Sequence, residues 1–395
     1  MKHKQFSILH CIVVYFLVFF NAFSLPLSVS IGGNLIAIFI SLFNTRRTCN
    51  KIVKHSIFKN LAFLIFYTFI VCIANDNFST YTLGKPLRLL FFCLMFNWVS
   101  RRVSLYSYKE LITGVVCAFL THLACVYLQF FIPATKLIFY SFLRTEDRID
   151  ITEDPLRAFG LDASFDGSGL DLCVLLTILW LVFRRTNNMN IFFLSFFTLV
   201  GCFMVGRTAM VLGMILFVLM ILSLVKSHKI YFFLTIIISI IGVCYIYDIA
   251  MVYINSNDVS QSYSMYTVQW LTSDRMLFLP NSIFGTLLGT GLSPKDSDIG
   301  YIKIIHMIGI IGLFFVMKFY MNMILQVKKF SKYNRDITLF MMIFAFLLMA
   351  YNYKLLLLYS RGINDVFILF VFILFRRLAY ERKLFKYENH SISSL

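Results

Sequence analysis

Residues 157–183 read RAFGLDASFDGSGLDLCVLLTILWLVF, a polar turn that leads directly into an apolar run. The turn, 157–169, contains one Arg, two Asp and three Gly. The apolar run is one of many in this chain. Several of them have about 17–22 residues, the length that crosses a hydrocarbon core of ~30 Å. The stretch therefore predicts a polar loop at a membrane surface, followed by a membrane-spanning helix.

The composition of the whole chain leads to the same interpretation. Apolar residues make up 59% of the 395 residues and charged residues only 14%, and there are 45 Phe. A soluble domain has about 25% charged residues. The first apolar block follows MKHKQ and is long for a secretory signal, so we expect it to be retained as a helix. These features predict an all-α, polytopic integral membrane protein that forms a single domain over residues 1–395.

The apolar runs predict about 12 transmembrane helices. Their expected ranges are 6–24, 27–44, 57–74, 87–100, 111–132, 168–183, 190–205, 208–225, 230–249, 302–326, 337–350 and 363–375. No internal repeat and no Gly/Ser-rich or Pro-rich linker divides the chain.

Short basic clusters fall in every second connection, as in RRTCNKIVK (46–54), RRVSLYSYK (101–109) and KKFSKYNR (328–335). Because short basic loops remain in the cytoplasm, both termini are predicted to be cytoplasmic. The two longest non-apolar stretches, about 133–167 and 250–301, are then expected on the outer face. Chemistry is expected there, since the connections on the cytoplasmic side are short.

Two other classes of protein are disfavoured by the same pattern. The net charge of +17 could indicate a nucleic-acid binder, but the basic residues are dispersed between apolar blocks and form no single stripe. The nine Cys lie almost entirely inside apolar blocks and form no CxxC pair. We therefore expect no nucleic-acid partner, no disulfide framework, no metal site and no cofactor.

Three arginines are predicted on three separate outer loops: Arg157, Arg207 and Arg275. A guanidinium group offers fixed, bidentate donors that match phosphate oxygens. Three such groups on one membrane face can converge on a lipid-linked diphosphate and stabilise it as a leaving group. A carboxylate, with Asp296 and Asp298 as candidates, can then take the proton from an acceptor hydroxyl.

Each of these features also has a purely structural interpretation. Arg207 can be an interfacial anchor at a helix end. Asp162 and Asp166 can be N-cap and turn residues before the helix that follows, which is the expected role of at least one of them. His306 lies on an apolar helix face, where packing or a hydrogen bond between helices is the more common role.

Four stretches carry a resemblance to a known family: RAFGLDASFDGSGLDL, VGRTAMVLGMIL, SDRMLFLPNSIFGTLLGTGL and DSDIGYIKIIHMIGIIGL. In their order and spacing they resemble the Wzy-type O-antigen polymerases, which belong to a superfamily that includes the O-antigen ligases. The resemblance implies a metal-independent, integral-membrane glycosyltransferase with two large periplasmic loops. It also implies a location in the bacterial inner membrane.

The implied reaction moves a growing glycan from undecaprenyl diphosphate onto a lipid-linked repeat unit at the periplasmic face. The implied partners are the lipid-linked donor and acceptor, the membrane itself and a separate chain-length regulator protein. By the resemblance, Arg157, Arg207 and Arg275 hold the diphosphates, and Arg157 and Arg275 take part in catalysis. The glycines of these segments are expected to shape the loops: Gly160, Gly289 and Gly291.

Polymerase and ligase differ at the entry to a late span. The ligases typically have His-Asn there, with His as the base, whereas this chain has Asp298 at the matching position. This difference favours a polymerase and makes Asp298 the first candidate for the base, with His306 deeper in the span. An O-antigen ligase and a flippase or transporter for lipid-linked sugars remain the alternatives. A transporter usually shows repeats and ionisable groups at mid-membrane.

Overall fold

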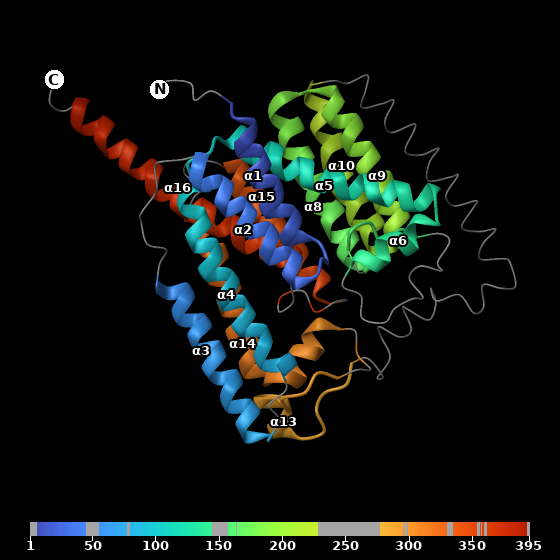
Figure 1. The fold of residues 1–395 in the computed structure, drawn as a ribbon, viewed down its shortest axis with the longest axis vertical. Coiled ribbons are helices and arrows are strands. Elements are labelled where there is room, and N and C mark those ends of the chain that lie inside the picture. Colours follow the sequence, from blue (N-terminus) through green and yellow to red (C-terminus); the bar gives the residue numbers. More distant parts are fainter. Residues whose placement is uncertain are drawn as a thin grey trace, which may run out of the picture.

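The computed structural model describes residues 6–44, 55–76, 80–143, 157–162, 164–227, 277–294, 297, 299–329, 335–353, 356, 358 and 362–392. Within these ranges the chain is helical and contains no strand (Figure 1). The prediction of an all-α protein is confirmed for this part of the chain. The predicted span 230–249 and the candidate residues Arg275, Asp296 and Asp298 lie outside the described residues.

The helices are α1 (Ile8–Ala22), α2 (Leu27–Asn44), α3 (His55–Ala74), α4 (Thr80–Val103), α5 (Tyr108–Phe131), α6 (Thr135–Phe142), α8 (Phe165–Thr186), α9 (Met189–Val205), α10 (Arg207–Ser227), α13 (Ile283–Leu288), α14 (Gly300–Lys328), α15 (Arg335–Tyr351) and α16 (Ile363–Ile392). Every predicted span except 230–249 coincides with one of these helices.

Four described helices are long and apolar enough to cross a membrane: Ile57–Ala74 within α3, α5, α8 and α14. Shorter apolar stretches lie in α1, α2, α9 and α10. Such a set of apolar helices is typical of a membrane-embedded protein. The number of about 12 crossings stays a prediction.

The two expected outer loops contain helical segments of their own. The stretch 133–167 includes α6 and the first residues of α8, and the stretch 250–301 includes α13. The α8 helix begins three residues earlier than expected, because the Ser164 side chain accepts a hydrogen bond from the Gly167 N–H at 3.0 Å and caps it.

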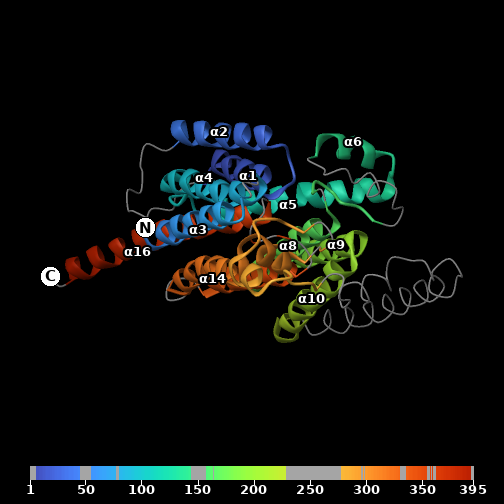
Figure 2. The same cartoon turned by 90° about the horizontal axis from the view of Figure 1, so that it is seen from below.

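The α8 helix lies at the centre of the molecule. Nearly all of its side chains from Gly167 to Phe183 are buried. A helix that is apolar on every side is expected to be enclosed by other helices. It packs against α9, α10 and α15, while α3, α4 and α14 lie side by side elsewhere in the bundle (Figures 1 and 2). The polar segment that begins at Arg157 therefore leads into a helix that other helices enclose along most of its length.

Contacts group the helix ends as the charge pattern predicts. At the basic ends, the Glu110 carboxylate accepts a hydrogen bond from the Ser7 N–H at 2.8 Å, and Arg185 Nε lies 2.7 Å from Asp336 Oδ2. At the opposite ends, the segment 157–162 contacts the ends of α1 and α9. The ends assigned to one side by sequence thus meet one another. Which side is cytoplasmic stays a prediction.

Candidate functional site

The Arg157 segment folds onto the ends of α1 and α9. The Ala158 N–H donates to the Met204 carbonyl at 2.9 Å, and the Ser24 N–H donates to the Leu161 carbonyl at 3.2 Å. Ala158 is fully buried, and Arg157 next to it is half-buried. These backbone bonds fix the segment at the same end of the bundle as the α9–α10 turn.

Two buried side chains of α5 form hydrogen bonds to the backbone of residues 159–161. Gln129 Oε1 accepts from the N–H groups of Phe159 at 3.0 Å and Gly160 at 2.8 Å, and its Nε2 donates to the Gly160 carbonyl at 2.7 Å. His122 Nδ1 accepts from the Leu161 N–H at 3.1 Å, so the neutral ring carries its proton on Nε2. The Gln129 amide and the His122 imidazole thus provide hydrogen-bond partners for the backbone N–H and C=O groups of a buried turn, and they fix its shape.

Gly160 has φ +59°, a conformation that favours glycine. A Cβ added there would lie 2.6 Å from His122 Cε1. Backbone conformation and close approach therefore both require glycine at this position.

The start of α8 carries the two aspartates of the turn. Ser164 is the N-cap, Asp166 lies in the first helical turn, and Asp162 accepts a hydrogen bond from the Ser24 hydroxyl. A Cβ added at Gly167 would lie 1.9 Å from Asp162 Oδ2, so the loop folds back closely over the helix. A carboxylate in the first turn also interacts favourably with the helix dipole. Asp162 and Asp166 have these local roles, while the cap itself is a serine.

Two of the three predicted arginine segments are brought together. Arg207 is the first residue of α10 and is exposed, three positions after the Met204 carbonyl that binds Ala158. A Cβ added at Gly169 of α8 would lie 2.7 Å from Ala209 Cβ, so α10 starts directly against α8. The Arg157 guanidinium lies 5.4 Å from the centre of the Phe165 ring. Arg275 is outside the described residues.

Asp171 is a residue that the sequence analysis did not single out. It lies in the second turn of α8, is fully buried, and neither carboxylate oxygen has a hydrogen-bond partner among the described residues. Asp162 on the turn lies close enough to interact with it electrostatically. Burying a carboxylate without partners is costly, and such residues in membrane helices often mark functional sites. The available signal was one Asp inside the apolar run that follows the turn.

The second predicted glycine segment is inserted against a break in α14. Gly309 has φ +68° and ψ 178°, which interrupts the helix. The carbonyl of His306 accepts from the Thr290 N–H at 2.7 Å and that of Met307 from the Gly291 N–H at 3.2 Å. The Thr290 hydroxyl also donates to the His306 carbonyl at 2.9 Å. Backbone N–H groups of the loop thus replace those of the helix as donors to these carbonyls. A break in a membrane helix requires such replacement partners.

Glycine is required on both sides of this contact. Gly289 has φ +96° and Gly291 has φ +75°. A Cβ added at Gly289 would lie 2.6 Å from Ile308 Cα, and one added at Gly309 would lie 2.2 Å from the Leu287 carbonyl oxygen. The two backbones touch without intervening side chains.

Polar side chains of α3, of Asn75 directly after α3, and of α4 also bind this loop. Their donors reach the carbonyls of residues 288, 289 and 291: Tyr67 at 3.1 Å, Asn75 at 3.3 Å and Thr82 at 2.7 Å. His306 Nε2 donates to the Phe278 carbonyl at 3.0 Å, and its ring meets the Phe278 ring edge to face. His306 therefore has the packing and hydrogen-bonding role of the structural interpretation.

The last turn of α15 connects the two regions. The Tyr301 hydroxyl at the start of α14 donates to the Met349 carbonyl at 2.8 Å. Two residues further on, the Tyr351 hydroxyl lies 3.9 Å from Cys173 Sγ in α8 and would lie 3.2 Å from a Cβ at Gly169. The entry of α14, which follows the candidate carboxylate Asp298 in the sequence, is thus linked to α8 through one turn of α15.

A buried ion pair that the sequence analysis also missed joins α4 and α16. Arg88 Nη1 lies 3.1 Å from Asp365 Oδ2, and Asp365 is fully buried. Beside it, the Tyr320 hydroxyl donates to Asn364 Oδ1 at 2.7 Å. Breaking such a pair costs about 3–5 kcal/mol, because one charge is left buried alone. The ion pair joins α4 to α16, and the hydrogen bond from Tyr320 joins α14 to the same end of α16.

The described residues contain no group of three or more His, Cys, Asp or Glu that could hold a metal ion. No protein-family model, curated protein or solved structure matches this chain. In the described part of the chain, the segments of Arg157 and Arg207 lie together at one end of the bundle, and the buried carboxylate of Asp171 lies in the helix that follows the Arg157 segment.

Proposed function

We propose that this protein is a membrane-embedded glycosyltransferase that polymerises a lipid-linked surface polysaccharide such as O-antigen. The donor glycan would leave undecaprenyl diphosphate and join a lipid-linked repeat unit at the periplasmic face of the bacterial inner membrane. The observation that supports this most is the 2.9 Å hydrogen bond between Ala158 and Met204, since it unites the Arg157 segment with the turn that carries Arg207.

In the proposed reaction the acceptor hydroxyl oxygen forms a bond to the anomeric carbon of the donor. The bond from that carbon to the lipid diphosphate breaks, and the diphosphate leaves with the electron pair. Arg157 and Arg207, with Arg275 from the predicted outer loop, neutralise the charge that develops on the diphosphate. The hydrogen bonds from the guanidinium groups strengthen as negative charge grows on the leaving diphosphate. They therefore stabilise the transition state more than the bound substrate, which lowers the activation barrier.

The hydroxyl proton needs an acceptor within hydrogen-bonding reach. Asp298 is the candidate from sequence, and Asp171 is a second candidate because its carboxylate lies beneath the Arg157 turn without a partner among the described residues. Asp162 is less suited, since its carboxylate accepts a hydrogen bond from the Ser24 hydroxyl. His306 is engaged with the Phe278 carbonyl.

A direct test reconstitutes the full-length protein in vesicles with an undecaprenyl-diphosphate-linked repeat unit and separates the products by size. We expect a ladder of polymers from the wild type and none from Arg157→Ala or Arg207→Ala at equal protein level. Lys at these positions should restore little, because a point charge does not reproduce a bidentate fork. Full ladders from both Ala variants would contradict the diphosphate role.

The ligase alternative is tested in the same vesicles by adding a lipid core acceptor. A ligase attaches a finished glycan to the core without lengthening it, whereas the proposed polymerase lengthens the lipid-linked glycan and leaves the core unmodified.

A further inference from the structure

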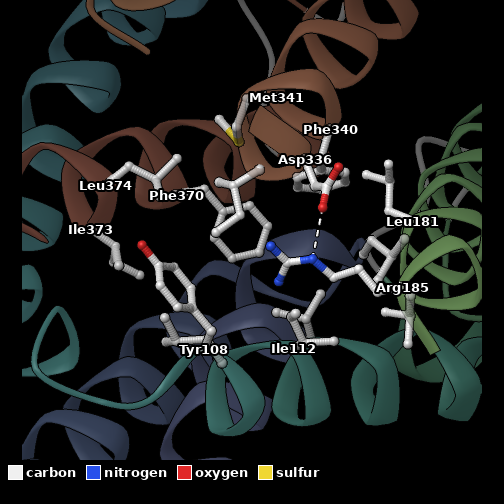
Figure 3. Close-up of a pocket in the computed structure, with 15 residues that line it drawn as sticks. Tyr108, Ile112, Leu181, Arg185, Asp336, Phe340, Met341, Phe370, Ile373 and Leu374 are labelled. Carbon is white, nitrogen blue, oxygen red and sulfur yellow. Dashed lines mark hydrogen bonds and ion pairs between the residues drawn. The ribbon is translucent and has the colours of Figure 1, made fainter. Parts of the chain in front are cut away.

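A cavity of about 120 Å³ lies between α5, α8, α15 and α16 at the basic end of the bundle (Figure 3). Apolar side chains form nearly all of its wall, including Ile112, Phe340 and Phe370. The polar lining residues are Tyr108, Arg185 and Asp336. The cavity lies at the C-terminal end of α8, whereas the Arg157 turn precedes the N-terminal end of the same helix. The proposed reaction does not use this cavity.

Arg185 is the charged residue that reaches into this cavity. Its Nε donates to Asp336 Oδ2 at 2.7 Å, while Figure 3 shows the two terminal nitrogens of the guanidinium on the cavity side, directed toward Tyr108 and Phe370. The side chain is 52% exposed, so it is also accessible from outside the bundle. A permanent cation is therefore held over an apolar chamber.

The rim of the cavity carries a surplus of positive charge. Arg184 precedes Arg185 at the end of α8, and Arg335 precedes Asp336 at the start of α15; both arginines are exposed. The ends of α8 and α15 that meet at the cavity thus carry three arginines and one aspartate among their described residues, although only Arg185 and Asp336 line the cavity itself. The carboxylate orients Arg185 but does not cancel the local charge, so an anionic group is favoured there.

The apolar wall alone cannot select a ligand inside a membrane, because lipid tails are as apolar as the side chains. Selection must come from the head group that accompanies a tail. Basic pockets between membrane helices on the cytoplasmic side are known binding sites for anionic lipid head groups. The basic end of this bundle is the end that the charge pattern assigns to the cytoplasm.

We propose that this cavity binds one anionic glycerophospholipid of the cytoplasmic leaflet. The lipid phosphate accepts hydrogen bonds from the Arg185 guanidinium, and one acyl chain occupies the space between Ile112 and Phe370. Asp336 orients the guanidinium from the opposite side. This site is independent of the glycan chemistry proposed for the opposite end of the bundle.

Native mass spectrometry of the full-length protein, equilibrated with phosphatidylglycerol or phosphatidylcholine, tests the proposal. We expect the wild type to retain phosphatidylglycerol preferentially. Arg185→Gln should lower that retention about fivefold, the effect of one basic residue near an anionic lipid. Arg101→Gln is the matched control, since it removes the same charge from α4, which does not line the cavity, and it should retain phosphatidylglycerol like the wild type.

Asp336→Asn separates lipid binding from a purely structural ion pair. Both Arg185→Gln and Asp336→Asn break the same pair, but the proposal predicts opposite effects, because removing the carboxylate leaves the rim more positive. Retention of phosphatidylglycerol should fall in the first variant and hold or rise in the second. Equal losses in both, equal losses in Arg101→Gln and Arg185→Gln, or equal retention of the two lipids by the wild type would each overturn the proposal.

Discussion

Gly309→Ala tests how the loop 288–291 is held in the bundle. Gly309 has φ +68° and ψ 178°, a region that only glycine occupies readily, and the strain of placing another residue there is about 1–3 kcal/mol. The added Cβ would also lie 2.2 Å from the Leu287 carbonyl oxygen. Overpacking of this kind costs a further ~1–3 kcal/mol. The two effects together amount to roughly 2–6 kcal/mol.

The chain can relieve this strain by straightening α14 and releasing the loop. The carbonyls of His306 and Met307 would then accept from their own helix instead of from Thr290 and Gly291. Hydrogen exchange followed by mass spectrometry reports this directly, because those two amides would lose their partners. A loss of about 2 kcal/mol corresponds to roughly 30-fold faster exchange.

Gly84→Ala is the control, since a Cβ at this position in α4 meets no atom within 4 Å. Alanine in a helix should leave stability unchanged or raise it by up to about 1 kcal/mol. We expect Gly309→Ala to melt well below Gly84→Ala in detergent and to expose the amides of Thr290 and Gly291. Equal melting temperatures and equal exchange in the two variants would refute this description of the loop.

Three further outcomes are expected from other parts of the molecule. Asp171→Leu should melt at or above the wild-type temperature, since it removes a buried carboxylate that has no hydrogen-bond partner among the described residues. It should also make no polymer when Asp171, rather than Asp298, is the base, so a fully active variant would exclude Asp171 from the machinery. Gln129→Leu leaves the Phe159 and Gly160 N–H groups unsatisfied and should cost about 2–6 kcal/mol, measured as thermal unfolding in detergent, so an unchanged melting temperature would contradict the bonding described. In a cysteine-depleted background, an impermeant thiol reagent should label Asn281→Cys but not Asn187→Cys in intact cells, and the reverse pattern would overturn the predicted orientation.

The helices were predictable because apolar length is a strong signal. The run 168–183 identified α8, and the neighbouring runs identified the helices around it. The ends were less predictable, because local capping decides them. Ser164 caps α8, so this helix begins earlier than hydropathy alone suggests. The α4 helix begins at Thr80, before the apolar residues that predicted the span 87–100, because polar residues can also be helical.

Arg157 and Arg207 could be named as candidates from the sequence because an arginine in a polar turn carries its own chemistry, and their role stays a prediction. Partners from distant helices were not predictable. Gln129 lies in the last turn of the apolar helix α5 and His122 about two turns before it, and only the fold shows that they hold the turn that begins at Arg157. Asp171 did not stand out either, because its burial without a partner among the described residues is a property of the packed structure and not of the sequence.

The break in α14 had a partial signal. Gly309 occurs within a run that otherwise reads as one continuous span, and a single glycine in such a run does not by itself predict a kink. The kink depends on Thr290 and Gly291, which supply the replacement hydrogen bonds from a separate loop.

Polymerisation itself is tested most directly by the surface glycan of a strain in which this gene is deleted and then restored. The glycan is released and separated by size, with the Arg157→Ala form as a second complementing copy. We expect the deletion strain to carry single repeat units on its lipid core, wild-type restoration to return the ladder of long chains, and the Arg157→Ala copy to fail. A bare core with polymer still on its lipid carrier would identify a ligase instead, and the absence of all surface and lipid-linked periplasmic glycan would identify a flippase.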